Sequence, residues 1–87
     1  MKNYRKTDYF ETGSDISITK RCHSPGDVAE HTHEFAELVY VFSGTGAQVV
    51  DGVSYPERRG AAIFINYGSV HDIRPETPMT QLDVLLS

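Results

Sequence analysis

The sequence predicts an all-β domain of the barrel or sandwich class. Hydrophobic and polar residues alternate with a period of two, most clearly in residues 81–86, and helical periodicity is almost absent. Turn-forming residues interrupt this alternation about every 8 to 12 positions, which is typical of barrels and sandwiches. The chain has 87 residues, a length that corresponds to one small domain.

The turn signals divide the chain into an N-terminal arm, residues 1–13, and a barrel domain, residues 14–87. Asp51-Gly52 suits a two-residue type I′ hairpin turn, because both central residues of that turn need a positive φ. The apolar run 61–65 predicts a strand buried on both faces, and residues 57–60 read as a charged loop. The expected strands are residues 15–22, 30–35, 37–42, 47–50, 53–55, 61–65, 70–73 and 81–86.

Composition argues against several functional classes. The net charge is −4, and the eight Lys and Arg residues are scattered, whereas nucleic-acid binding needs a concentrated basic face. A single cysteine, Cys22, allows no internal disulfide, which is typical of a reducing compartment. The N-terminus has no apolar run typical of a signal peptide, and no segment is apolar enough to span a membrane. We therefore expect a cytoplasmic protein without membrane contact.

Side chains two residues apart on a strand point to the same face. If one strand direction continues through residues 31–41, two histidines and a carboxylate share an apolar face, a costly arrangement unless a ligand or hydrogen bonds satisfy them. His71 follows a turn much later in the chain and is expected to approach the same point. The shared face comprises His31, His33, Phe35, Glu37, Val39 and Val41.

Three imidazoles and one carboxylate form a ligand set suited to Zn, Fe, Mn, Ni or Cu, whereas Ca²⁺ and Mg²⁺ prefer oxygen ligands. The sequence therefore predicts a metal site at His31, His33, Glu37 and His71. The alternative is that the histidines are hydrogen-bonded core residues and that Glu37 pairs with Arg58 or Arg59.

Two motifs resemble the conserved motifs of the cupins. Gly26-x4-His31-x-His33-x3-Glu37-x6-Gly44 resembles the first motif, and Gly60-x5-Asn66-Tyr67-Gly68-x2-His71 resembles the second. Gly26 stands one residue closer to His31 than in the usual pattern, Asn66 replaces a proline, and Pro75 replaces an asparagine. The resemblance covers about residues 14–87 and implies a small double-stranded β-helix, or jelly-roll barrel, with a divalent transition metal (Zn, Fe, Mn or Ni) on the four residues above.

A closer resemblance involves residues 30–41, the Gly44-Thr45-Gly46 segment and the hairpin around residues 51–55. These resemble the N-terminal effector domain of AraC-type transcription regulators, especially the regulators of rhamnose use. The resemblance implies a sensor that binds a sugar or another small metabolite and contributes to dimerisation. DNA contact would then belong to a separate C-terminal domain that these 87 residues do not contain. Two other functions remain open: a stand-alone metal cupin enzyme of the isomerase or dioxygenase type, and a dimerisation domain without a ligand.

Aromatic and cationic side chains near the expected barrel mouth complete the predicted site. Aromatic faces stack on sugar C–H surfaces, and an arginine holds polar ligand groups. We also expect a homodimer, because Leu38, Tyr40, Phe42, Leu82, Val84 and Leu86 would form an apolar outer face. The ligand-binding candidates are Phe35, Tyr55, Arg58 and Tyr67.

Overall fold

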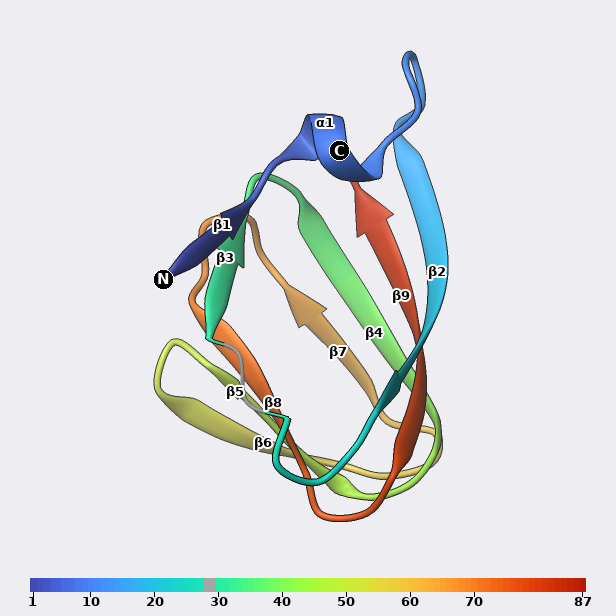
Figure 1. Cartoon of the computed structure of the whole chain (residues 1–87), viewed down its shortest axis with the longest axis vertical. Helices are drawn as coiled ribbons and strands as arrows, with labels where there is room; N and C mark the ends of the chain where they lie inside the picture. The colour runs from blue at the N-terminus through green and yellow to red at the C-terminus, as the bar shows by residue number, and fades with distance from the viewer. Residues whose placement is uncertain (28–29) are drawn as a thin grey trace.

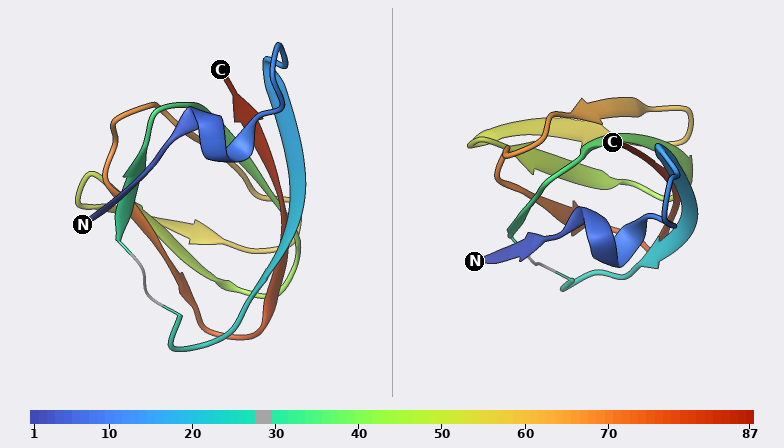
Figure 2. Two further views of the ribbon diagram at one scale, coloured as in Figure 1. Left: turned by 45° about the horizontal axis from the view of Figure 1, so that its top comes forward. Right: turned by 90° about the horizontal axis from the view of Figure 1, so that it is seen from above.

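Two β-sheets face each other in the computed structural model, which describes residues 1–27 and 30–87 (Figure 1). One sheet has the strand order β1-β3-β8-β5-β6, and the other has the order β2-β9-β4-β7. Figure 2 shows the two sheets curving around a common interior. Apart from the single-turn helix α1 (Lys6–Tyr9), the described secondary structure is β-strand, so the predicted all-β jelly-roll barrel is confirmed.

The strand positions agree with the predicted ones to within a few residues, except for one additional strand at the N-terminus. The hairpin between β5 and β6 turns on Asp51 and Gly52, whose φ angles of 48° and 82° match the predicted type I′ turn. The strands are β1 (Lys2–Tyr4), β2 (Ile16–His23), β3 (His31–His33), β4 (Ala36–Ser43), β5 (Gly46–Val50), β6 (Val53–Glu57), β7 (Ala62–Ile65), β8 (His71–Pro75) and β9 (Met79–Leu86).

The N-terminal segment, expected to be an arm rather than part of the barrel, joins one of the two sheets. Strand β1 pairs in parallel with β3 at the edge of the five-stranded sheet. Helix α1 follows immediately, and the backbone N–H of Lys6 donates a hydrogen bond to the Glu34 carboxylate at 3.1 Å. Two short elements therefore lie over the barrel opening near the start of β4 (Figure 1).

The interior face of β4 follows the predicted parity. Val39 and Val41 are buried, whereas Leu38, Tyr40 and Phe42 are exposed on the outer face of the sheet. The prediction that the run 61–65 is buried on both faces is wrong, because β7 is the edge strand of its sheet. Only Ile65 is fully buried, and Phe64 points outward with 58% of its surface exposed.

One end of the barrel interior is closed by apolar packing. Val41, Ile73 and Met79 form a buried cluster, against which Ala61 packs. Two glycines allow the chain to approach this cluster closely: a Cβ at Gly44 would overlap the carbonyl oxygen of Pro78, and a Cβ at Gly46 would lie 2.6 Å from the carbonyl oxygen of Arg74. Within residues 1–27 and 30–87, no helix is long and apolar enough to cross a membrane.

Candidate functional site

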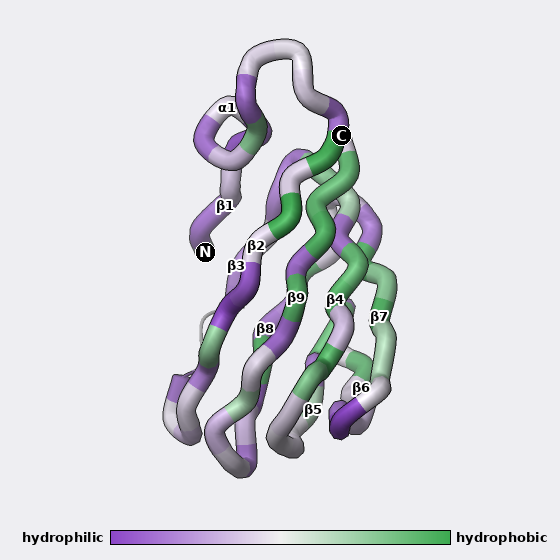
Figure 3. The backbone as a smooth tube through the Cα atoms, turned by 90° about the vertical axis from the view of Figure 1, so that its right-hand side faces the viewer, coloured by the Kyte–Doolittle hydropathy of each residue, from purple (hydrophilic) through white to green (hydrophobic). Residues whose placement is uncertain are grey.

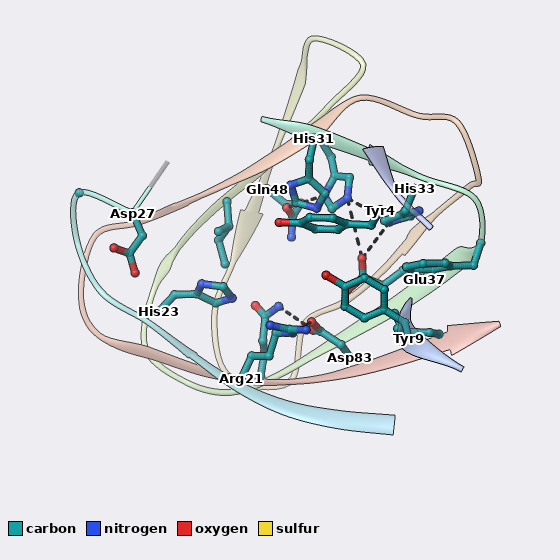
Figure 4. A pocket seen from close by; sticks show the side chains of 16 residues that line it. Tyr4, Tyr9, Arg21, His23, Asp27, His31, His33, Glu37, Gln48 and Asp83 are labelled. Atoms are coloured by element: carbon teal, nitrogen blue, oxygen red, sulfur yellow. Dashed lines mark hydrogen bonds and ion pairs between the residues drawn. The ribbon is translucent and has the colours of Figure 1, made fainter. Parts of the chain in front are cut away.

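A pocket of about 460 Å³ lies next to the buried apolar cluster in the barrel interior, and Ile73 borders both (Figure 4). Both sheets and the N-terminal segment contribute to its wall, and most of its polar groups come from interior-facing strand positions. Its lining residues are Tyr4, Tyr9, Arg21, His23, Gly26, Asp27, His31, His33, Phe35, Glu37, Gln48, His71, Ile73, Gln81, Asp83 and Leu85.

Strand pairing brings the predicted histidines together. His31 on β3 lies directly opposite His71 on β8, and their ring centroids are 4.0 Å apart. The start of β8 is held by the hairpin turn, because the backbone N–H of Val70 donates to the Asp51 carboxylate at 2.9 Å. His33 follows two residues after His31 on the same strand face, and its ring centroid lies 4.9 Å from that of His71.

The histidine nitrogens converge in a geometry suited to a metal ion. One ligand atom from each of His31, His33 and His71 lies within 4.8 Å of the other two. The Nε2 atoms of His33 and His71 are 3.1 Å apart. Two nitrogens bound to one metal at about 2.0–2.1 Å would be separated by roughly 2.9 Å at a right angle and roughly 3.4 Å at a tetrahedral angle. The observed separation lies within this interval, so the Nε2 atoms of His33 and His71 are spaced as two ligands of one transition metal.

Glu37 lies beside the same nitrogens, as the parity of the strand predicted. Its Oε1 atom is 3.1 Å from Nε2 of His33 and 3.8 Å from Nε2 of His71. Burial alone would raise the pKa of this carboxyl, but the hydrogen bond with His33 and the neighbouring His71 lower the pKa below its usual value. Glu37 is therefore an ionised carboxylate, available as a fourth ligand or as a hydrogen-bond acceptor. The alternative pairing of Glu37 with Arg58 or Arg59 is not observed among the described residues.

Gln48 orients His71 and was missed by the sequence analysis. The Nδ1 atom of His71 lies 3.3 Å from the Oε1 atom of Gln48, whose side chain is fully buried. A proton on Nδ1 donated to Gln48 leaves the Nε2 lone pair directed at the other histidines, a common arrangement behind metal-binding histidines. Burial, reinforced by the nearby His31, lowers the pKa of His71 to about 4. His71 is consequently neutral at pH 7, as a metal ligand must be.

A second polar group lies on the four-stranded sheet, and the sequence analysis missed it as well. Gln81 and Asp83 on β9 are both buried, and Arg21 on β2 forms an ion pair with Asp83 at 3.2 Å. Burial and the negative charge of Glu37 raise the pKa of Asp83 to about 7. The alternation of residues 81–86 could have identified these two residues as facing the interior. The apolar side chains Leu82, Val84 and Leu86 share the outer face, so Gln81 and Asp83 necessarily point inward.

Aromatic side chains close the pocket beside the histidines. Phe35 is buried and stacks on the ring of His33 with centroids 4.4 Å apart and planes 13° apart. Tyr9 and Phe10 pack against Phe35, and the ring of Tyr4 lies 4.6 Å from that of His31. The N-terminal segment therefore supplies part of the pocket wall, which its polar sequence did not indicate.

Three of the four predicted ligand-binding residues lie away from this pocket. Tyr55 and Tyr67 are 45% and 70% exposed and do not line it. Arg58 lines a separate shallow hollow near Gly60 and Glu76. Tyr67 was selected because it precedes His71 by four residues, but the turn at Gly68 directs it to solvent. Of the four candidates, only Phe35 lines the pocket.

Comparisons with known proteins agree with this architecture. The family model described as "Cupin domain" matches residues 22–85. An HTH-type transcriptional activator RhaR from Enterobacter sp. (strain 638) is 40% identical over 77 residues, covering 79% of this chain and 27% of that protein. The chain thus spans about a quarter of the length of this curated relative.

Solved structures share the fold at low sequence identity. A conserved protein of unknown function from Streptococcus pyogenes superposes with a TM-score of 0.79 at 19% identity, covering 98% of this chain and 80% of that one. An RmlC-like cupin from Shewanella frigidimarina NCIMB 400 superposes with a TM-score of 0.77 at 20% identity, covering 83% of this chain and 66% of that one. These similarities concern the fold alone.

Proposed function

The chain belongs to the cupin domain family, and we propose that it is the effector-sensing domain of an AraC-type transcription regulator. The observation that carries this proposal is the 40% identity with an HTH-type transcriptional activator over 79% of the chain. In such a regulator, effector binding shifts a conformational equilibrium to which the DNA-binding part responds. DNA contact would belong to the remainder of the regulator, since this chain carries a net charge of −4.

The effector is a small sugar-like molecule bound in the barrel. A pocket of about 460 Å³ falls within the range of roughly 300–1,000 Å³ that is typical of small-molecule sites. It combines apolar surface from Phe35, Ile73 and Leu85 with convergent polar groups on both walls. The resemblance to regulators of rhamnose use makes L-rhamnose the first effector to test.

A divalent transition metal (Zn, Fe, Mn or Ni) would be held by His31, His33 and His71, with Glu37 as the fourth ligand. Such an ion would act as a Lewis acid and coordinate oxygen atoms of the effector. Neighbouring side chains position these ligands. Gln48 holds the tautomer of His71, and Phe35 packs on the ring of His33. In the absence of metal, Glu37 accepts a hydrogen bond from His33.

One variant and two assays test this proposal. Purified wild-type chain should contain close to one transition-metal ion per molecule by elemental mass spectrometry, and calorimetry should detect L-rhamnose binding. His33→Ala should lower the metal content sharply, because the ion loses one of its ligands. His23→Ala is the matched control, since His23 lines the same pocket outside the histidine cluster and should leave the metal content unchanged.

Other outcomes would separate the remaining functions. If metal is absent and His33→Ala weakens sugar binding by about 1–3 kcal/mol, the site is a metal-free sugar pocket, because a buried polar partner is left unpaired. If His33→Ala changes neither metal content nor sugar binding, the effector-sensing proposal is wrong and the histidines are structural.

A stand-alone metal cupin enzyme of the isomerase or dioxygenase type is the alternative, favoured by the ionised Glu37 next to the three histidines. A carboxylate in that position is suited to proton transfer on a metal-bound substrate. NMR of L-rhamnose incubated with the metal-loaded chain distinguishes the two functions: turnover supports an enzyme, and unchanged sugar supports a sensor.

We further propose that two copies associate through the outer face of the four-stranded sheet (Figure 3). Strand register places Ile18, Val84, Leu38 and Phe64 in one apolar row across all four strands. Ile18 and Phe64 are 62% and 58% exposed, and a second copy that presents the same face would cover them.

Sedimentation at high micromolar concentration should show a dimer for the wild type and a monomer for Leu38→Lys. Val53→Lys, at an exposed apolar position of the other sheet, is the control and should remain dimeric. A monomeric wild type would contradict the dimer.

A further inference from the structure

The pocket has a second polar wall that faces the histidines. Arg21 comes from β2, and Gln81 and Asp83 come from β9, so all three belong to the four-stranded sheet. Figure 4 shows Arg21 and Asp83 on one side of the pocket, with His31 and Gln48 on the other. A ligand that fills the pocket would therefore contact both the histidines and this wall.

The wall is held in a fixed arrangement by its own hydrogen bonds. The Nε atom of Arg21 lies 3.2 Å from Oδ2 of Asp83, and the Nε2 atom of Gln81 donates to Oδ1 of Asp83 at 2.7 Å. The side chains of Gln81 and Asp83 are buried, with 3% and 4% of their surface exposed. Such preorganised groups lose little freedom when a ligand binds.

Gln81 presents a buried acceptor without a partner. Its Oε1 atom makes no hydrogen bond to any described residue, although it is inaccessible at the surface. The amide cannot reverse without directing Oε1 at the Asp83 carboxylate oxygen, so the acceptor is fixed in its present direction. A buried acceptor left unpaired is costly, so a ligand hydroxyl that reached Oε1 from the pocket that Gln81 lines would relieve this cost.

The charge of the wall selects against anions. The guanidinium of Arg21 is paired with Asp83, and the carboxyl group of Glu37 faces the same pocket. Among the described residues that line the pocket, Arg21 is the one lysine or arginine, so a ligand carboxylate or phosphate placed here would meet the carboxyl groups of Asp83 and Glu37 with no second side chain of this kind to compensate. A hydroxyl group instead donates to Gln81 or Asp83 and accepts from the guanidinium of Arg21.

From this geometry we propose that Arg21, Gln81 and Asp83 form a hydroxyl-recognition subsite, which restricts the effector to neutral polyhydroxylated molecules. The proposal rests on the proposed effector-sensing function and identifies the ligand class and the residues that select it. The histidines would hold one end of the effector, and this subsite would hold hydroxyl groups at the opposite end.

The test compares two ligands and two variants by calorimetry on the metal-loaded full chain. L-rhamnose should bind at least tenfold more tightly than L-rhamnonate, which has the same carbon skeleton but carries a carboxylate. Arg21→Met and Gln81→Leu should each weaken L-rhamnose binding at least tenfold without changing the metal content. Lys20→Met is the matched control, because Lys20 precedes Arg21 on β2 but points outward, and it should bind like the wild type. Arg21 is partly exposed, so Arg21→Met remains informative if Gln81→Leu does not fold.

The outcomes separate this inference from the proposed function. If L-rhamnose binds and both variants bind it as tightly as the wild type, the subsite is wrong while the effector-sensing function remains. If L-rhamnonate binds more tightly than L-rhamnose, the neutral ligand class is wrong and an anionic effector takes its place. If neither ligand binds, the subsite fails together with the sugar-sensing function, whereas the metal content of His33→Ala still reports on the histidine site.

Discussion

The two ends of the barrel interior are built from the same strands with opposite chemistry. At the closed end, β4, β8 and β9 contribute Val41, Ile73 and Met79 to a buried apolar cluster. At the pocket end, the same three strands present Glu37, His71 and Asp83. This difference predicts that the closed end contributes most of the stability of this small domain, because the pocket end carries polar groups that are costly to bury unless a ligand satisfies them.

Glu57 is the exception at the closed end. Its side chain is 2% exposed, and neither carboxylate oxygen has a hydrogen-bond partner within residues 1–27 and 30–87. The sequence analysis placed Glu57 in a charged loop, whereas the structure includes it as the last residue of β6. Burial and the negative charge of Glu37 raise its pKa to about 7.

The largest expected effect comes from Gly44→Ala at the closed end. The added Cβ would overlap the carbonyl oxygen of Pro78, and the φ of 88° is unfavourable for alanine. We expect the free energy of unfolding to fall by more than about 4 kcal/mol, which would leave much of the protein unfolded in solution. Circular dichroism and urea unfolding measure this effect. Gly52→Ala is the control: its φ is 82° but no atom lies within 4 Å of the added Cβ, so a loss of about 1–2 kcal/mol is expected. Equal losses for the two variants would show that the close packing at Gly44 is unimportant.

Met79→Ala tests whether the closed end dominates stability. Met79 is 1% exposed, and its truncation leaves a cavity. We therefore expect the free energy of unfolding, measured in urea, to fall by about 2–5 kcal/mol. His33→Ala at the pocket end should cost only about 1 kcal/mol in metal-free protein, because water enters the enlarged pocket and solvates the remaining groups. If His33→Ala lowers the free energy of unfolding more than Met79→Ala does, the pocket end contributes more to stability than the closed end.

Glu57→Gln should stabilise the protein at alkaline pH. The pKa of Glu57 rises from 4.5 to about 7 on folding, so its favourable contribution is complete below about pH 4.5 and is lost as the pH rises through 7. Glu57→Gln removes this loss, and we expect a gain of about 1–3 kcal/mol at pH 8 that disappears near pH 4.5. Glu76→Gln is the control, because Glu76 is exposed and lines the same surface hollow as Glu57, Arg58 and Gly60. It should change the free energy of unfolding by less than about 0.5 kcal/mol at both pH values. A gain that is independent of pH would exclude titration of Glu57 as the cause.

Tyr9→Ala tests how far the N-terminal segment belongs to the pocket end. Tyr9 packs on Phe35 with ring centroids 5.6 Å apart, and an aromatic pair of this kind contributes about 0.5–1.5 kcal/mol beyond the buried area. We expect a loss of about 1 kcal/mol, measured by thermal unfolding. Tyr67→Ala is the control, because Tyr67 is 70% exposed and should leave stability unchanged. No effect of Tyr9→Ala would support an N-terminal arm that is not part of the barrel.

Strand positions and the shared face of His33 and Glu37 were predictable from the sequence because they depend on local rules, whereas His71 was grouped with them by the resemblance to the cupin motifs. The period of two assigned His33 and Glu37 to one face, and the paired motifs brought His71 to the same point. The ligand-binding candidates Tyr55, Arg58 and Tyr67 were selected by residue type and by proximity along the chain. They lie outside the pocket because a turn or an edge strand, rather than sequence separation, decides which way a side chain points.

What the sequence alone determined is the fold class and the strand parity that groups His31, His33 and Glu37, since alternation and turn chemistry act over a few residues. The resemblance to the cupin motifs added His71 to this group. Only the tertiary structure decided what faces those residues. Arg21, Gln81 and Asp83 reach the pocket because β9 pairs between β2 and β4, and Tyr4 and Tyr9 reach it because β1 adds to the edge of the other sheet. The pairing of distant strands depends on contacts between residues far apart in the chain, and no local pattern encodes it.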